Sequence, residues 1–71
     1  MKKITRHQLD KLIEDIKTAR LYLTILISDK KERKEIAEKT GVSYSYLTDA
    51  ANGRKIIGDK TVIEILNKWI S

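Results

Sequence analysis

Turn-forming residues are scarce in this chain, which has no proline and only three glycines among its 71 residues. A sheet of several short strands would need a turn after each strand, and such turns favour glycine and proline. Much of the chain instead places apolar residues three and four positions apart, which is the spacing along one face of a helix. The sequence therefore predicts an all-α fold of four or five short helices.

The short length limits how such helices can be stabilised. A chain of this size buries only about 60% of the surface that its unfolded form exposes, so we expect one domain over residues 1–71. The chain has no cysteine and one histidine, His7, which leaves no disulfide and no cluster of metal ligands. We therefore predict no metal and no cofactor, and oligomerisation or a bound partner remains as a source of added stability.

Charge and hydropathy narrow the class of partner. No apolar stretch approaches the roughly 18 residues of a membrane-spanning helix, and the basic first residues lack the apolar segment of a signal peptide. We expect a cytoplasmic protein with no membrane partner. The formal net charge of +5 favours an anionic partner, of which nucleic acid is the leading candidate.

Capping residues mark where each helix should begin. Thr5 and Gln8 fit a capping box, in which each side chain bonds the backbone amide of the other residue. The residues expected to cap the helices are Thr5, Asp29, Ser43 and Asp59. The helices so predicted span about residues 6–27, 31–39, 44–52 and 60–70, with a break near residues 20–22 as an alternative.

The predicted core gathers apolar residues from the inward face of each helix. It consists of Leu9, Leu12, Ile13, Ile16, Leu23, Leu26, Ile36, Ala37, Val42, Leu47, Ala50, Val62, Ile65, Leu66 and Trp69. The helix over residues 31–39 contributes only a narrow apolar stripe, so we expect it to lie on the surface.

Residues 33–53 carry the most informative pattern. Ala37 is small enough to let another helix cross close against it, and Gly41 permits a sharp turn by taking a positive φ. Ser43 can cap the helix that follows, and Leu47 lies on the face that packs back on the preceding helices. The side chains left outside form one polar stripe: Tyr44, Ser45, Thr48, Asp49 and Asn52. Two helices that cross at a glycine turn, the second with an exposed polar stripe, are typical of DNA binding in the major groove.

The pattern resembles the helix-turn-helix of the lambda-repressor-like and Cro-like regulators, at about residues 32–53. The residues that carry the resemblance are Ile36-Ala37, Gly41-Val42-Ser43, Leu47 and Asn52-Gly53. Small members of this family include phage and mobile-element repressors. The resemblance implies that a set of side chains contacts base edges, namely Tyr44, Ser45, Thr48, Asp49 and Asn52. The sequence departs from many relatives in having Arg33 and Tyr44 where they carry glutamine.

Basic and hydroxyl side chains around this motif are the candidates for phosphate contacts. They are Arg33, Ser43, Tyr46, Arg54 and Lys55. Asp49 would repel phosphates, and it can either accept a hydrogen bond from cytosine N4 or pair with a basic neighbour. A run of three further lysines, Lys30, Lys31 and Lys34, can equally be a solvated helix face, and Lys2, Lys3 and Arg6 can be either a basic arm or solvated side chains.

The last helix has more apolar residues than its own domain needs. We predict that a homodimer, formed at least on DNA, uses the surplus, and the residues of this interface are Ile63, Leu66, Trp69 and Ile70. Trp69 stands two residues from the end of the chain, where we expect its own domain to leave it partly uncovered. Two-fold pairing would favour a palindromic operator.

The leading hypothesis is therefore sequence-specific binding of double-stranded DNA by a small transcriptional regulator. An enzyme is not expected, because no catalytic triad, metal-ligand spacing or phosphate-binding loop is present, and no small-molecule effector is implied. One alternative is an excisionase-like architectural DNA binder. Another is a protein-interaction or antitoxin-type helical module that uses residues 21–27 and 62–70.

Overall fold

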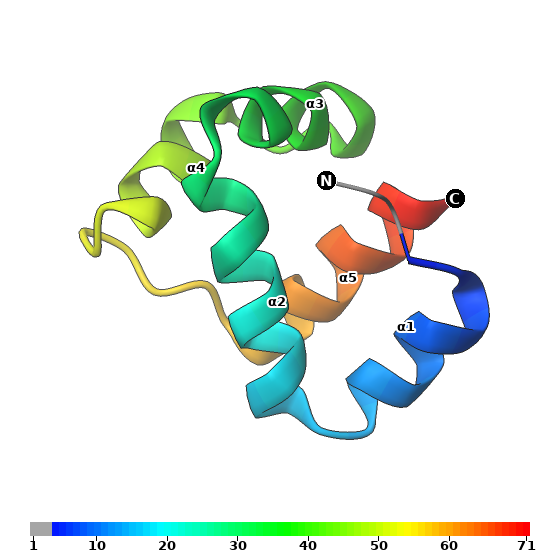
Figure 1. Ribbon diagram of the computed structural model, residues 1–71. Helices are drawn as coiled ribbons and strands as arrows, with labels where there is room; N and C mark the ends of the chain where they lie inside the picture. Colours follow the sequence, from blue (N-terminus) through cyan, green and yellow to red (C-terminus); the bar gives the residue numbers. More distant parts are fainter. Residues whose placement is uncertain (1–3) are drawn as a thin grey trace.

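The computed structural model describes residues 4–71, so Lys2 and Lys3 of the basic-arm hypothesis lie outside the described residues. This part of the chain forms five helices and no strand, which confirms the all-α prediction (Figure 1). The helices are α1 (Arg6–Ile13), α2 (Ile16–Ser28), α3 (Lys30–Thr40), α4 (Tyr44–Ala51) and α5 (Asp59–Ile70). None of the five is long and apolar enough to cross a membrane.

Three of the four predicted caps are confirmed. The Thr5 hydroxyl accepts from the Gln8 amide at 3.1 Å and the Gln8 side chain accepts from the Thr5 amide at 2.8 Å. Asp29 accepts from two free amides at the start of α3, and Ser43 accepts from one at the start of α4. Asp59 does not cap α5: it is the first residue of that helix, its carboxylate pairs with Arg20, and the capping position is taken by Gly58, which has no side chain to bond the free amides.

The prediction of one long helix over residues 6–27 is wrong, and so is its alternative of a break near residues 20–22. The break falls at Glu14 and Asp15, well before residues 20–22. Asp15 caps α2 by accepting from the Lys17 amide at 3.1 Å and from the Thr18 hydroxyl at 3.0 Å. An aspartate gains more from capping than from the interior of a helix, and the turn lets α1 fold back against α2 and α5 (Figure 1).

The core lies where α5 passes between the other helices (Figure 1). Its buried apolar residues are Leu9, Ala19, Leu23, Leu26, Ile27, Ile36, Leu47, Ile57, Val62, Ile65, Leu66 and Trp69. Six residues predicted to be buried are instead half-buried against this cluster: Leu12, Ile13, Ile16, Ala37, Val42 and Ala50. Three core residues are missing from the predicted core: Ala19, Ile27 and Ile57.

Two further predictions about burial are wrong. Trp69 is only 2% exposed, because α5 runs through the centre of the fold and its last turn is covered by the domain itself. Glu32 is 7% exposed, although α3 was expected to keep its charges on the surface. Burial raises the pKa of the neighbouring Tyr22 hydroxyl, and the Glu32 carboxylate raises it further.

Replacing Gly41 with alanine should lower the free energy of unfolding by about 1–2 kcal/mol, because its φ of +77° lies in the left-handed region. A Cβ added there meets nothing within 4 Å, so the cost is backbone strain and not a clash. Gly58 is the matched control: its φ is −64°, and Gly58→Ala should change stability by less than about 0.5 kcal/mol. Urea denaturation measures both, and equal effects would contradict the conformational argument.

Candidate nucleic-acid interface

The turn between α3 and α4 is built as the sequence pattern predicts. Gly41 ends α3 in the left-handed conformation and its amide donates to the Ala37 carbonyl at 3.0 Å. The amide of Val42 donates to the Thr40 hydroxyl, which itself donates to the Ile36 carbonyl. These bonds tie the Gly41 and Val42 amides to the last turn of α3, and α4 packs across α3 beyond the turn (Figure 1).

The outward stripe of α4 is present, and its centre is recessed. Tyr44, Ser45 and Asn52 are exposed, whereas Thr48 and Asp49 are half-buried. The Thr48 hydroxyl oxygen is covered and lies beside the Tyr44 hydroxyl. The prediction that all five side chains stand fully outside is therefore correct for three of them.

Arg33 holds Tyr44 in place. One guanidinium nitrogen donates to the Ile27 carbonyl at 3.2 Å and another to the Tyr44 hydroxyl at 3.4 Å, while the guanidinium carbon lies 5.3 Å from the centre of the Tyr44 ring. The hydrogen bond from Arg33 lowers the pKa of the Tyr44 hydroxyl below its ordinary value. Arg33 was predicted only as a phosphate contact. In the structure it also orients the Tyr44 side chain.

Tyr44 should lose its proton at a lower pH than Tyr22, since Arg33 lowers the pKa of the first hydroxyl and burial raises that of the second. A folded-state pKa below the unfolded one means that ionised Tyr44 adds stability. That contribution appears as the pH rises through the folded-state pKa, and is complete above the unfolded-state value of about 10. Tyrosine Cζ shifts followed by NMR against pH measure the order. Arg33→Met should return Tyr44 to its ordinary range, and an unchanged titration would contradict the contact.

Asp49 pairs with a basic neighbour, which was one of the two roles left open by the sequence. Its carboxylate lies 3.2 Å from Nε of Arg54, and the Arg54 amide donates to the Asp49 carbonyl at 2.8 Å. Both side chains stay accessible, with 65% of the Arg54 side chain exposed. The pair neutralises the acid that faces outward and fixes the chain as it leaves α4, so Arg54 keeps two of its nitrogens for another partner.

The remaining predicted phosphate contacts cluster around the same helix. The Lys55 ammonium lies 5.3 Å from the centre of the half-buried Tyr46 ring, and the Ser43 hydroxyl is used as the cap of α4. Two lysines of the basic run, Lys30 and Lys34, line a shallow hollow of about 430 Å³ beside Tyr44. The sequence pattern gave no signal for this hollow, because its walls come from one face of α3 and the first residue of α4.

The four residues predicted as a dimer interface do not share one surface. Leu66 and Trp69 are buried within their own domain, while Ile63 and Ile70 are half-buried. Among residues 4–71, the large apolar side chains that are exposed lie elsewhere, at Leu21, Ile25, Tyr44 and Ile56. An interface on α5 would therefore have to rely on Ile63 and Ile70 alone.

No protein-family model matches the chain, and neither the curated proteins nor the solved structures give a match.

Proposed function

We propose that this protein binds double-stranded DNA with sequence preference, as a small transcriptional regulator of the repressor kind that its motif resembles. One observation carries the proposal: the exposed stripe of α4 is flanked by cations at both ends. Arg33, Lys30 and Lys34 lie around Tyr44 at its start, and Arg54 and Lys55 follow its end. A helix that lies in the major groove has a phosphate strand on either side, so cations are useful at both ends.

Within this proposal some side chains of the stripe contact bases and one, Asp49, positions a phosphate-binding cation. Tyr44, Ser45 and Asn52 are accessible for base edges, whereas the covered Thr48 hydroxyl would have to be uncovered before it could reach one. Asp49, held by Arg54, acts by orienting that cation toward a phosphate. Eight residues of α4 reach few base pairs, so two copies on a palindromic operator would supply the specificity that one cannot.

DNA affinity should fall steeply with salt. If each of two protomers places Arg33, Arg54 and Lys55 on phosphates, the slope of log K against log salt should be about −5. Arg54→Ala should flatten that slope by about one unit for each bound protomer and weaken all sequences alike. Fluorescence anisotropy with a labelled duplex at several salt concentrations measures the slope.

Lys11 provides the control for this experiment. It is exposed on α1, which packs against α2 and α5 and not against α4. Lys11→Ala should therefore leave the slope unchanged. A slope near zero for the parent protein, or equal changes for Lys11→Ala and Arg54→Ala, would overturn the assigned phosphate contacts.

Competitor DNA separates the proposed regulator from the two alternatives. A regulator should remain bound to its own operator in the presence of excess unrelated duplex, whereas an architectural binder should be displaced by a duplex of any sequence. A protein-interaction module should not shift DNA at all. Either of the last two results would replace the proposal.

A further inference from the structure

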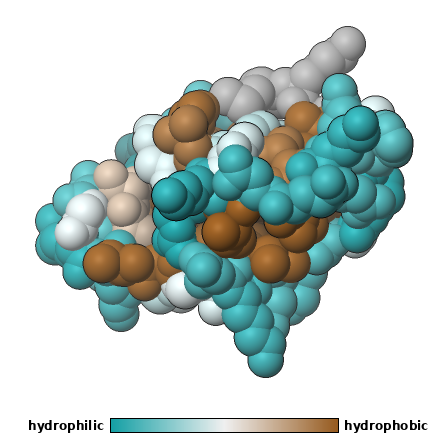
Figure 2. Space-filling view, turned by 90° about the horizontal axis from the view of Figure 1, so that it is seen from below, coloured by the Kyte–Doolittle hydropathy of each residue, from teal (hydrophilic) through white to brown (hydrophobic). Residues whose placement is uncertain are grey.

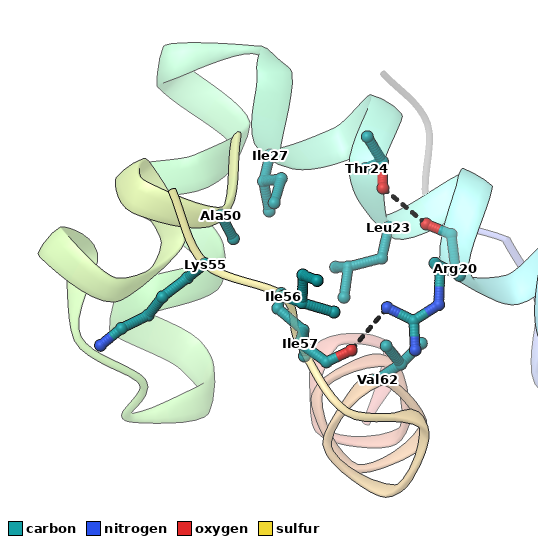
Figure 3. A pocket seen from close by; sticks show the side chains of 9 residues that line it. All are labelled: Arg20, Leu23, Thr24, Ile27, Ala50, Lys55, Ile56, Ile57 and Val62. Atoms are coloured by element: carbon teal, nitrogen blue, oxygen red, sulfur yellow. Dashed lines mark hydrogen bonds between the residues drawn. The ribbon is translucent and has the colours of Figure 1, made fainter. Parts of the chain in front are cut away.

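A pocket of about 220 Å³ opens between α2, α4, α5 and the loop that joins α4 to α5 (Figure 3). Leu23 and Ile27 of α2, Ala50 of α4 and Val62 of α5 contribute apolar walls. These residues come from three segments that meet only in the folded chain. The sequence alone therefore implied no small-molecule effector, whereas the structure offers a cavity for one.

The charges around the pocket have one sign. Arg20 and Lys55 are the charged residues of its lining, and no aspartate or glutamate of residues 4–71 lines it. Thr24 adds a hydroxyl, and the other lining residues are apolar. A cavity that combines apolar walls with cations suits a molecule that has an apolar body and an anionic group.

Lys55 is the cation that remains available to such a molecule, because Arg20 already donates to the Ile57 carbonyl and pairs with Asp59. Lys55 forms no ion pair within residues 4–71. Its ammonium points away from the pocket in Figure 3 and lies 5.3 Å from the centre of the Tyr46 ring. An exposed contact of this kind is weak, and the flexible lysine stem can bring the ammonium back to the mouth of the pocket.

The size of the pocket limits its ligand to a small molecule. An apolar cavity near 150 Å³ holds benzene, so at the same ratio about 220 Å³ holds roughly nine non-hydrogen atoms. On the face seen from below, apolar areas are interrupted by hydrophilic side chains, which gives a protein partner little continuous apolar area (Figure 2). We propose that the pocket binds a small carboxylic acid with a compact apolar body, whose carboxylate pairs with Lys55.

The effect of this ligand on DNA binding rests on the proposed function. Lys55 is there assigned to a phosphate, so a carboxylate that pairs with Lys55 competes with the DNA backbone. The ligand would therefore lower DNA affinity and act as an effector of the regulator. Binding of the ligand does not itself require DNA, so the two proposals can fail separately.

Titration with sodium benzoate, followed in methyl and amide NMR spectra at constant ionic strength, tests the site. Benzoate matches the expected size and should shift the methyl signals of Leu23, Ile27 and Val62, with a dissociation constant on the order of 1 mM. Benzamide has the same shape without the charge and should bind about 10-fold more weakly. Acetate has the charge without the apolar body and should leave these methyl signals unchanged.

A first pair of variants tests the cation. Lys55→Met keeps the aliphatic stem and removes the charge, so benzoate affinity should fall about 10-fold, to that of benzamide. Lys11→Met removes a charge from an exposed site on α1 and should leave benzoate affinity unchanged. Because Lys55 is exposed, this test does not depend on a change in the core.

A second pair tests the cavity. Ala50→Val adds methyl groups at the wall of the pocket and should weaken benzoate and benzamide alike, by about fivefold or more. Ala51→Val adds the same groups at a half-buried neighbour outside the lining and should weaken neither. Circular dichroism should show that both variants keep the helical fold.

Fluorescence anisotropy with a labelled duplex measures the effect on DNA. Benzoate at about 10 mM should weaken DNA binding about 3–10-fold relative to acetate at the same concentration. Lys55→Met should remove that difference. If the parent protein bound no DNA, the proposed function would fall, and the NMR titration would still decide the site.

Each outcome decides the proposal. Shifts at the three methyl-bearing residues that depend on the charge of the ligand and on Lys55 would support the site. Equal affinities for benzoate and benzamide, shifts confined to other parts of the protein, or no shifts up to about 20 mM would overturn it. Benzoate bound in the pocket with the DNA affinity seen in acetate would overturn its role as an effector.

Discussion

Replacing Leu66 with alanine should lower the free energy of unfolding by about 2–5 kcal/mol. Leu66 is fully buried where α5 crosses the centre of the domain, so the substitution leaves a cavity among packed side chains. A loss of this size is a large part of the stability of so short a chain. Ile63→Ala on the flank of the same helix should cost less, because Ile63 is only half-buried and is not part of the core cluster.

Urea denaturation of the two variants distinguishes a core helix from an interface helix. If Leu66 served mainly to hold a second copy, Leu66→Ala would destabilise the protein only where the protein is dimeric, and its effect would depend on protein concentration. We expect an effect that is independent of concentration. A dependence on concentration would restore α5 as the site of pairing.

Changing Tyr44 or Thr48 should alter base preference by about 1–3 kcal/mol at single operator positions while leaving the fold intact. Tyr44→Phe keeps the ring over Arg33 and removes the hydroxyl that Arg33 bonds. Thr48→Val keeps the shape and removes a hydroxyl that is covered beside Tyr44. Affinities for a set of singly altered operators, measured by competition, give the change at each position.

Ser28→Ala provides the control for these two substitutions, because Ser28 is exposed at the end of α2 and its hydroxyl donates to the Thr24 carbonyl. It should leave base preference unchanged. If Tyr44→Phe and Thr48→Val also give the profile of the parent protein with folding confirmed, the stripe of α4 is not the surface that reads the bases.

The parts of the fold that follow from local chemistry could be predicted from the sequence. The capping box at Thr5, the aspartate cap of α3, the left-handed glycine at residue 41 and the serine cap of α4 each depend on a few consecutive residues. The outward positions on α4 follow from the helical period once its start is known. These features place the candidate site on the chain and orient its stripe.

The rest depends on contacts between distant segments. The apolar period runs on through Glu14 and Asp15, so it hides the turn between α1 and α2. Ile57 lies in the loop between α4 and α5, so no helical spacing of apolar residues indicates that it is buried. Trp69 stands near the end of the sequence, and contacts with distant segments leave only 2% of it exposed. The bond from Arg33 to Tyr44 joins residues 11 positions apart across the turn, and no local pattern indicates that Arg33 orients the stripe.

Selection of bound duplexes from a random library tests the central claim most directly. The 71-residue protein, without added partner, should enrich one sequence motif, and Tyr44→Phe should change the preferred base at a defined position within it. Two inverted copies of the motif, spaced by about one helical turn, would further indicate a pair of protomers. Recovery of unrelated sequences without enrichment would contradict sequence-specific binding. A motif identical for the parent protein and for variants of Tyr44 and Thr48 would contradict base reading by the stripe of α4.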